Sequence, residues 1–339
     1  MPLLAFQGDT ARQPSKWRPE KKCKLSPTFT TGFASLILSI SSTTDPLVSH
    51  RQHFGRTVFA LCNYPSLLTN GILRLEQMED TPLENFPADH EEILHVGELI
   101  GKGAAGARGD DTKTLKSAVL DWITPKGEAI QPPLHRNSKV DRGFNHELTG
   151  FLLWDWIGTT YSTTKMNLRS GELWVCGDQW PIFLYAHYTY NTEDPWSGLL
   201  RSRLLVYAYK HVFTSPSSVE KEPKATRSGN ACLHGMTSVT IASIAYIATQ
   251  VRFALSSSSV FSRTDMTTDS ETFYHSLLDL LKDPEESKEV HELLTWWNRQ
   301  IFPTSSAAKR PISANSALSK IRQRHLALKQ SSISNVATS

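Results

Sequence analysis

The stretch 226–230 carries side chains that suit the binding of an anion or of a partner's backbone. Together they offer a guanidinium, two hydroxyls, an amide and a glycine that lets another group approach closely. A histidine follows four residues later. The candidate binding residues of this segment are Thr226, Arg227, Ser228, Asn230 and His234.

Two further cations precede this segment. Arg203 and Lys210 are seven residues apart, so both project from one face of a predicted helix. The loop that follows, 214–240, is long for a compact domain, and such loops are usually functional or disordered. Two interpretations stay open: a binding site that includes Arg203 and Lys210, or a solvated loop that bonds to itself.

The same residues admit an enzymatic hypothesis. Arg227, Asn230 and His234 would act with a distant carboxylate, Asp178 or Asp194, in a nuclease-like remnant. That hypothesis requires these side chains to meet in one pocket. The sequence contains no coherent catalytic motif, so we favour a non-enzymatic helical interaction module.

Motifs for nucleotides and metals fail on context or spacing. Gly101, Gly103 and Gly106 match G-x-G-x-x-G, but the segment before them has helical rather than strand periodicity. His90 and His95 would lie about 140° apart around a helix, which prevents joint binding of zinc. We therefore expect neither a cofactor nor a metal.

The C-terminal tail is basic. It holds Lys309 and Arg310 and, after nine intervening residues, Lys320, Arg322 and Arg324. This arrangement resembles a two-part nuclear import signal and suits contact with phosphates. A DNA-binding protein anchored by its tail is therefore a third hypothesis.

Charge is distributed unevenly over the 339 residues. The net charge is +3, but residues 1–24 carry +4 and residues 303–339 carry +6, which leaves −7 for residues 25–302. A mildly acidic body excludes a protein that grips nucleic acid with its whole surface. Four scattered cysteines indicate reduced thiols, and no apolar run reaches the ~20 residues of a membrane span. We expect a soluble protein of the nucleus or cytoplasm, with a protein or nucleic-acid partner and no membrane partner.

Apolar periodicity predicts a mainly α fold with a single helical domain at 85–303. Residues 1–84 are predicted to be poorly structured or disordered, with weak late-docking helices as the alternative, and residues 304–339 form a basic disordered tail. Long loops and at most a short β-hairpin near 173–178 complete the domain.

Capping signals place the individual helices. Two helices are predicted between residues 89 and 124, separated by the glycine-rich stretch, and another begins at Asp194-Pro195. The segment 241–255 is apolar nearly all round, which predicts a central helix. A capping box at 268–271 and the pair Asp283-Pro284 start the last two helices, and the second of these ends before Pro303.

Several long strings between residues 90 and 312 are distinctive. They include Arg142-Gly-Phe-Asn-His146, Ala225-Thr-Arg-Ser-Gly-Asn-Ala231 and Trp296-Trp-Asn-Arg-Gln-Ile-Phe302. These strings resemble an uncharacterised domain family that is expanded in mushroom-forming (basidiomycete) fungi. The resemblance implies no known activity, fold or ligand. It implies only an association with mobile elements and with a nuclear or nucleic-acid-related role. The chain departs from that family at 152–166, and residues 1–80 lie outside the resemblance.

Overall fold

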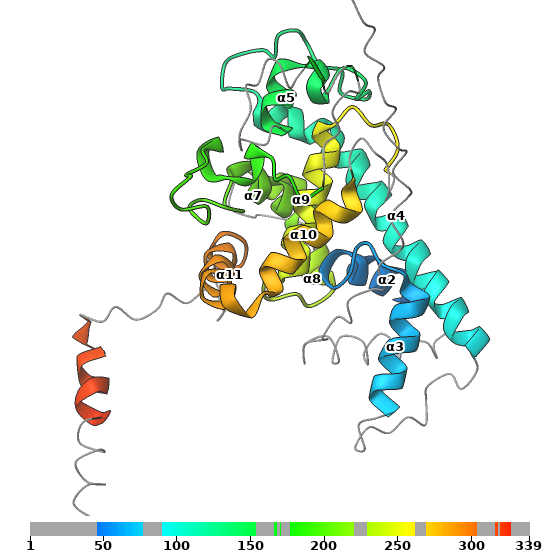
Figure 1. The fold of residues 1–339 in the computed structure, drawn as a ribbon, viewed down its shortest axis with the longest axis vertical. Helices are drawn as coiled ribbons and strands as arrows, with labels where there is room; N and C mark the ends of the chain where they lie inside the picture. The colour runs from blue at the N-terminus through cyan, green and yellow to red at the C-terminus, as the bar shows by residue number, and fades with distance from the viewer. Residues whose placement is uncertain are drawn as a thin grey trace, which may run out of the picture.

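A computed structural model describes residues 46–76, 90–153, 166–167, 170, 177–219, 229–261, 269–303, 316–317 and 319–326. Throughout these residues the regular elements are helices, which confirms the predicted mainly α fold class (Figure 1). The core of the predicted β-hairpin falls outside the described residues. So do residues 1–45 and most of the tail, for which disorder was predicted.

The longer helices lie in the first and last parts of the described chain, with shorter ones between them. The α-helices are α2 (Pro46–Thr57), α3 (Tyr64–Glu76), α4 (His90–Ile123), α5 (Glu147–Leu153), α7 (Arg203–Tyr209), α8 (Asn230–Leu233), α9 (Ile241–Leu255), α10 (Ser270–Lys282) and α11 (Ser287–Ile301). A π-helical turn at Lys210–Thr214 extends α7, and a 3₁₀ turn at Ala186–Tyr188 precedes it. Figure 1 shows α9 and α10 in the middle, α4 along one side, and α7 and α11 on the other.

Helix α9 lies at the centre of the core, as its all-round apolar sequence predicted. Every residue from Ala242 to Leu255 is buried. The Thr240 side chain accepts from the Ser243 N–H, and the Ser243 hydroxyl accepts from the Thr240 N–H. This reciprocal capping satisfies backbone donors at the start of the helix.

Two buried cations cap the other end of α9. Lys139 donates to the Phe253 carbonyl at 2.6 Å, and Arg142 donates to the Ala254 carbonyl at 2.8 Å. Both carbonyls lie in the last turn, at the negative end of the helix, and the Phe253 carbonyl also accepts from the N–H and hydroxyl of the C-cap Ser256. The Arg142 string noted in the sequence therefore has a structural role here.

Helix α4 is continuous over 34 residues, where two helices with a break had been predicted. Its glycines remain helical because tertiary packing outweighs their low helix propensity. A Cβ on Gly97 would lie 2.6 Å from Cα of Pro65 in α3, and one on Gly103 would lie 2.4 Å from Cβ of Arg51 in α2. The glycines thus admit two neighbouring helices, and the G-x-G-x-x-G match is no phosphate-binding loop.

Residues 46–76 belong to the same folded body. Phe54 and Leu61 are 4% and 1% exposed and join the common hydrophobic core. Between α2 and α3, the Ala60 N–H donates to the Tyr274 hydroxyl of α10 at 3.1 Å. Helical structure therefore begins before residue 85.

The start of α7 differs from the prediction. The helix begins at Arg203, with Ser202 as its N-cap, rather than at Asp194-Pro195. Gly198 and Leu200 have φ of 75° and 54°. This left-handed backbone cannot continue a right-handed helix, so 194–200 forms turns.

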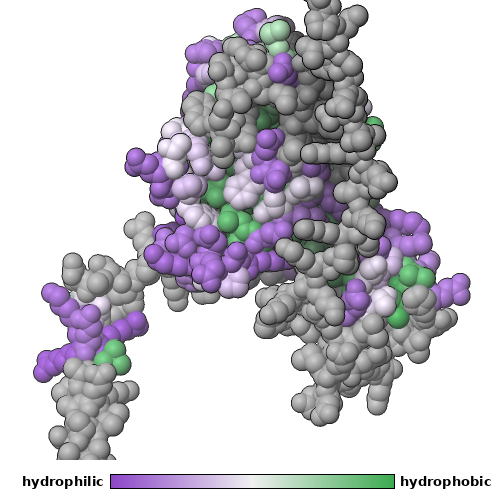
Figure 2. Space-filling model, in the orientation of Figure 1, coloured by the Kyte–Doolittle hydropathy of each residue, from purple (hydrophilic) through white to green (hydrophobic). Residues whose placement is uncertain are grey.

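The two last helices follow their predicted course. Helix α10 begins at Ser270 with Asp269 as its N-cap; the Asp269 side chain makes no capping bond and instead accepts from the Gly177 N–H at 3.0 Å. Thr268, the first residue of the predicted capping box, lies outside the described residues. Helix α11 buries Leu293 and Trp297, as its apolar stripe predicted. Figure 2 shows a mainly hydrophilic surface around α11.

Candidate functional site

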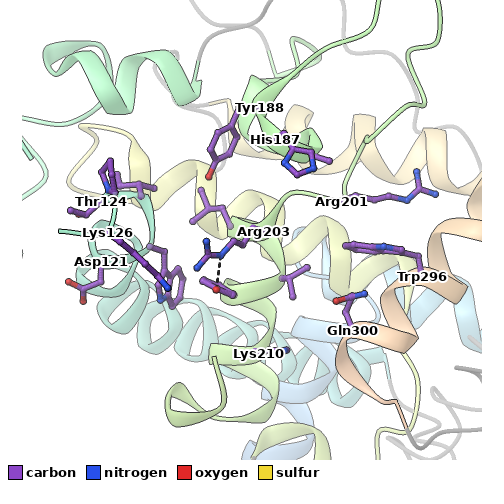
Figure 3. A pocket seen from close by; sticks show the side chains of 17 residues that line it. Asp121, Thr124, Lys126, His187, Tyr188, Arg201, Arg203, Lys210, Trp296 and Gln300 are labelled. Carbon is purple, nitrogen blue, oxygen red and sulfur yellow. Dashed lines mark hydrogen bonds between the residues drawn. The ribbon is translucent and has the colours of Figure 1, made fainter. Parts of the chain in front are cut away.

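A cleft of about 800 Å³ opens between the end of α4, the Ala186–Tyr188 turn, α7 and α11 (Figure 3). We call it the cationic cleft. Its lining includes Asp121, Trp122, Thr124, Lys126, His187, Tyr188, Arg201, Arg203, Tyr207, Lys210, Trp296 and Gln300. Elements far apart in sequence meet here because α4, α7 and α11 pack around the same core.

Positive charge predominates in the cleft. The cations of its lining are Lys126, Arg201, Arg203 and Lys210. Asp121 is the single carboxylate in the lining, and both of its oxygens accept from the guanidinium of Arg136, which lies outside the lining. With that carboxylate paired, the lining carries an excess of positive charge; outside the lining, the charges of Glu292 and Asp194 act on Arg201.

Arg203 is oriented by Tyr207, one helical turn later. Its Nε donates to the Tyr207 hydroxyl at 2.6 Å, and its guanidinium carbon lies 4.7 Å from the centroid of the Tyr207 ring. The hydrogen bond and the cation–π contact restrain an otherwise exposed side chain. Figure 3 shows this guanidinium in the middle of the cleft, where its fork suits a phosphate or carboxylate.

Aromatic side chains form much of the wall. The Trp122 ring packs edge-on against Tyr207, with ring centroids 6.0 Å apart. Burial raises the pKa of the Tyr188 phenol, and the charge of Arg203 opposes that rise. Tyr188 is therefore neutral at physiological pH and able to donate a hydrogen bond.

The rim of the cleft contains strained backbone. His187 and Tyr188 have φ of 58° and 56°, in the left-handed region that non-glycine residues rarely adopt. Each such residue costs about 1–2 kcal/mol. A hydrogen bond from the Ala186 N–H to the Gly198 carbonyl, 2.8 Å, anchors the turn. Strain of this kind is concentrated at functional sites.

Comparison with protein families matches residues 102–302 to DUF6698, a family of unknown function. The chain belongs to this family. The resemblance to an uncharacterised domain is thereby confirmed, while its distribution among fungi stays a prediction. Comparisons with curated proteins and with solved structures find no match.

The DUF6698 match contains the whole cationic cleft. The lining runs from Asp121 to Gln300, inside the matched residues 102–302, whereas α2 and α3 precede the match. In this chain the cleft therefore lies within the matched domain and not in the preceding helices. Among the described residues, no helix is long and apolar enough to cross a membrane.

Two of the residues predicted to bind an anion lie in the cleft. Arg203 and Lys210 both line it, as their shared helical face suggested. Thr226, Arg227 and Ser228 lie outside the described residues of the DUF6698 domain, so their part in a site stays a prediction.

The other two predicted residues make different contacts. The Asn230 amide donates to the Val212 carbonyl at 2.6 Å. The His234 ring stacks on His53 of α2, with ring centroids 4.3 Å apart. Neither Asn230 nor His234 lines the cleft.

The enzymatic hypothesis required these side chains to meet a carboxylate. Asp178 is exposed in the turn that begins at Gly177. Burial lowers the pKa of Arg201, and the charges of Glu292 and Asp194 partly oppose that shift. Asp194 therefore interacts with Arg201. The hypothesis stays a prediction because Arg227 lies outside the described residues.

None of the described basic residues of the tail is among the cleft-lining residues. Lys320, Arg322 and Arg324 are exposed on helical residues 319–326, and Lys309 and Arg310 lie outside the described residues. In the part of the chain that the structure describes, no group of three or more histidine, cysteine or acidic side chains is arranged for a metal.

Of the cleft lining, the sequence pointed only to Arg203 and Lys210 as binding residues. It did not select Lys126, Arg201, Trp296 or Gln300. Trp296 and Gln300 are four residues apart on α11 and line the cleft together, a spacing visible in the sequence. Nothing local indicated that α11 would face α7.

Proposed function

We propose that this DUF6698 domain is a non-enzymatic interaction module that binds an anionic ligand in the cationic cleft. The observation that carries the proposal is the charge of the lining: four Lys and Arg side chains face one carboxylate, which is already paired with Arg136. An anion entering the cleft would meet cations without displacing an internal partner of Arg203 other than the Tyr207 hydroxyl.

The lining favours binding over catalysis. Its histidine, His187, and its carboxylate, Asp121, lie on different sides of the cleft in Figure 3, so they form no acid–base pair. The Thr124 hydroxyl donates to the Leu120 carbonyl at 2.5 Å, which occupies it in helix capping. Arginine forks and lysine charges instead suit recognition of phosphate or carboxylate groups.

A titration with inorganic tripolyphosphate tests this proposal. Tryptophan fluorescence is a suitable signal because Trp122 and Trp296 line the cleft, and calorimetry gives the affinity. We expect saturable binding to the full chain, weakened about tenfold by Arg203→Ala, since a charge-assisted hydrogen bond contributes about 1.5–3 kcal/mol. Lys288→Ala, which removes an exposed cation of α11 outside the lining, should bind like the unchanged protein. Absence of binding, or equal weakening by both substitutions, would contradict the proposal.

The exposed basic residues of the tail support a second candidate function. Lys320, Arg322 and Arg324 project from helical residues 319–326, and we propose that they contact nucleic-acid phosphates in the nucleus. Deleting 304–339 should then abolish affinity for duplex DNA together with its steep salt dependence. Binding that persists without the tail, or that ignores salt, would rule this out.

A further inference from the structure

The cationic cleft changes in chemical character from one side to the other. Figure 3 shows Thr124 and Lys126 on one side, Trp296 and Gln300 on the other, and Arg203 between them. The first side offers charge. The second offers an aromatic ring and an amide, together with the Arg201 guanidinium, which Figure 3 shows above Trp296 and on which the charges of Glu292 and Asp194 act. A ligand that fills the cleft would need both kinds of group.

Trp296 and Gln300 form the side that suits a base. They are one turn apart on α11 and so share a face of that helix. The edge-on contact between Trp296 and the buried Trp297, with ring centroids 5.6 Å apart and planes at 90°, limits rotation of the Trp296 indole. The exposed Gln300 amide offers two donors and an acceptor. Nucleobases stack on aromatic rings and form hydrogen bonds along their edges.

Arg203 and Lys126 form the charged side. Arg203 is held by its contacts with Tyr207, and its guanidinium lies between Lys126 and Trp296 in Figure 3. Lys210 and Arg201 are the other two cations of the lining. A phosphate at Arg203 would therefore sit next to a base on Trp296 and leave further phosphates directed toward Lys126.

We propose that the anionic ligand is a nucleoside phosphate, with its base on Trp296 and Gln300 and its phosphates at Arg203 and Lys126. This inference rests on the proposed function of the cleft. A volume of about 800 Å³ lies within the usual range of small-molecule sites and exceeds the needs of a lone phosphate. The same chemistry is present in a free nucleotide and in a single-stranded RNA.

The test compares three probes on the full chain by calorimetry: ATP, inorganic tripolyphosphate and hexauridylate. We expect ATP to bind about tenfold more tightly than tripolyphosphate, because only ATP adds base stacking to the phosphate contacts. Hexauridylate that binds more tightly than ATP would assign the site to single-stranded RNA. Hexauridylate that binds more weakly would assign it to free nucleotides.

Two substitutions on α11 locate the base. Trp296→Leu should lower the affinity for ATP about tenfold, because base stacking is lost. It should change the affinity for tripolyphosphate by no more than about twofold, because the charges remain. Gln300→Ala, at an exposed position, should likewise lower the affinity for ATP and leave the affinity for tripolyphosphate unchanged. Trp180→Leu is the matched control, because Trp180 is half-buried outside the cleft, where its Nε1 donates to Ser276.

The outcomes separate this inference from the proposed function. Tripolyphosphate that binds as tightly as ATP, with no effect of Trp296→Leu or Gln300→Ala, would overturn the nucleoside assignment and leave an anion-binding cleft. Failure of all three probes to bind would overturn both. Selective loss of ATP affinity in the α11 variants would support both.

Discussion

Arg56 of α2 and Asp111 of α4 form a buried, bidentate ion pair. The Arg56 Nε and Nη2 atoms donate to the two carboxylate oxygens at 2.7 and 2.8 Å, and the two side chains are 5% and 8% exposed. Tyr246 of α9 donates to the same carboxylate at 2.5 Å. Three helices are thus joined at one charge. Because Arg56 precedes the DUF6698 match and Asp111 lies inside it, the pair ties α2 to the family domain.

Removing one partner of this pair should be strongly destabilising. We expect Asp111→Ala to lower the free energy of unfolding by about 3–5 kcal/mol, because it leaves the Arg56 guanidinium buried without a counter-charge. Urea unfolding followed by circular dichroism measures the loss. The double variant Arg56→Met, Asp111→Leu should be more stable than Asp111→Ala. If the double variant is the less stable of the two, the stranded charge is not the cause.

The close approach of α3 to α4 predicts opposite effects for two glycines. Gly97→Ala should lower the free energy of unfolding by about 1–3 kcal/mol, because its Cβ would lie 2.6 Å from the Pro65 backbone. Gly106→Ala should raise that free energy by about 0.5–1 kcal/mol, because its Cβ would meet no atom within 4 Å and alanine favours helix. Thermal unfolding of both variants measures these effects. A change of melting temperature with the same sign in both variants would contradict the packing argument.

Acid should destabilise the contact between α2 and the segment after α8. Burial, together with the smaller effects of His234, Arg56 and His50, lowers the pKa of His53 to about 3. His53 is therefore neutral in the folded protein, whereas the unfolded chain takes up the proton near its ordinary pKa of about 6.5. The stability that this neutral histidine contributes is complete above about pH 6.5 and is lost as the pH falls toward 3.

Substitution of His53 tests this pH dependence. His53→Phe retains a ring for stacking on His234 and removes the titrating group. We expect its melting temperature to fall less between pH 7 and pH 5 than that of the unchanged protein. His291→Gln, at an exposed position of α11, is the control. Its melting temperature should fall between pH 7 and pH 5 by the same amount as that of the unchanged protein. An equal fall of the melting temperature in all three proteins would show that His53 does not contribute to the pH dependence of stability.

Tyr207 should act on ligand affinity through Arg203. Tyr207→Phe keeps the ring below the guanidinium and removes the hydroxyl that accepts from Arg203 Nε. We expect tripolyphosphate affinity to fall about threefold to tenfold, within the range of one charge-assisted hydrogen bond. The free energy of unfolding should change by no more than about 0.5 kcal/mol, as at other surface positions. A large loss of stability with unchanged affinity would assign Tyr207 a structural role only.

Prediction of the helices succeeded where the signals were local. Helix α9 follows from an apolar run within which every residue is buried, and α11 from Asp283-Pro284 and a stripe that includes Leu293 and Trp297. Caps and apolar stripes act within one or two turns, so they can be recognised without knowledge of the fold. Prediction failed at the glycines of α4, whose helical state depends on α2 and α3 packing against them.

The candidate site was predictable only in part. Arg203 and Lys210 were selected because their spacing places them on one helical face, and both line the cleft. Asn230, chosen for its place in a polar loop, bonds instead to the Val212 carbonyl. A polar side chain in a sequence carries no sign of whether it will meet a ligand or a backbone group, because its partner is set by packing.

Local pattern sufficed for the helical class of this protein, the central place of α9 and two cations of the cleft. The continuity of α4, the late start of α7 and the meeting of Arg203 with Trp296 depended on the tertiary structure. The physical reason is the range of the interactions. Helix periodicity and capping act between neighbours in sequence, whereas close packing at Gly97 and the shared lining of α7 and α11 join residues that only the folded core brings together.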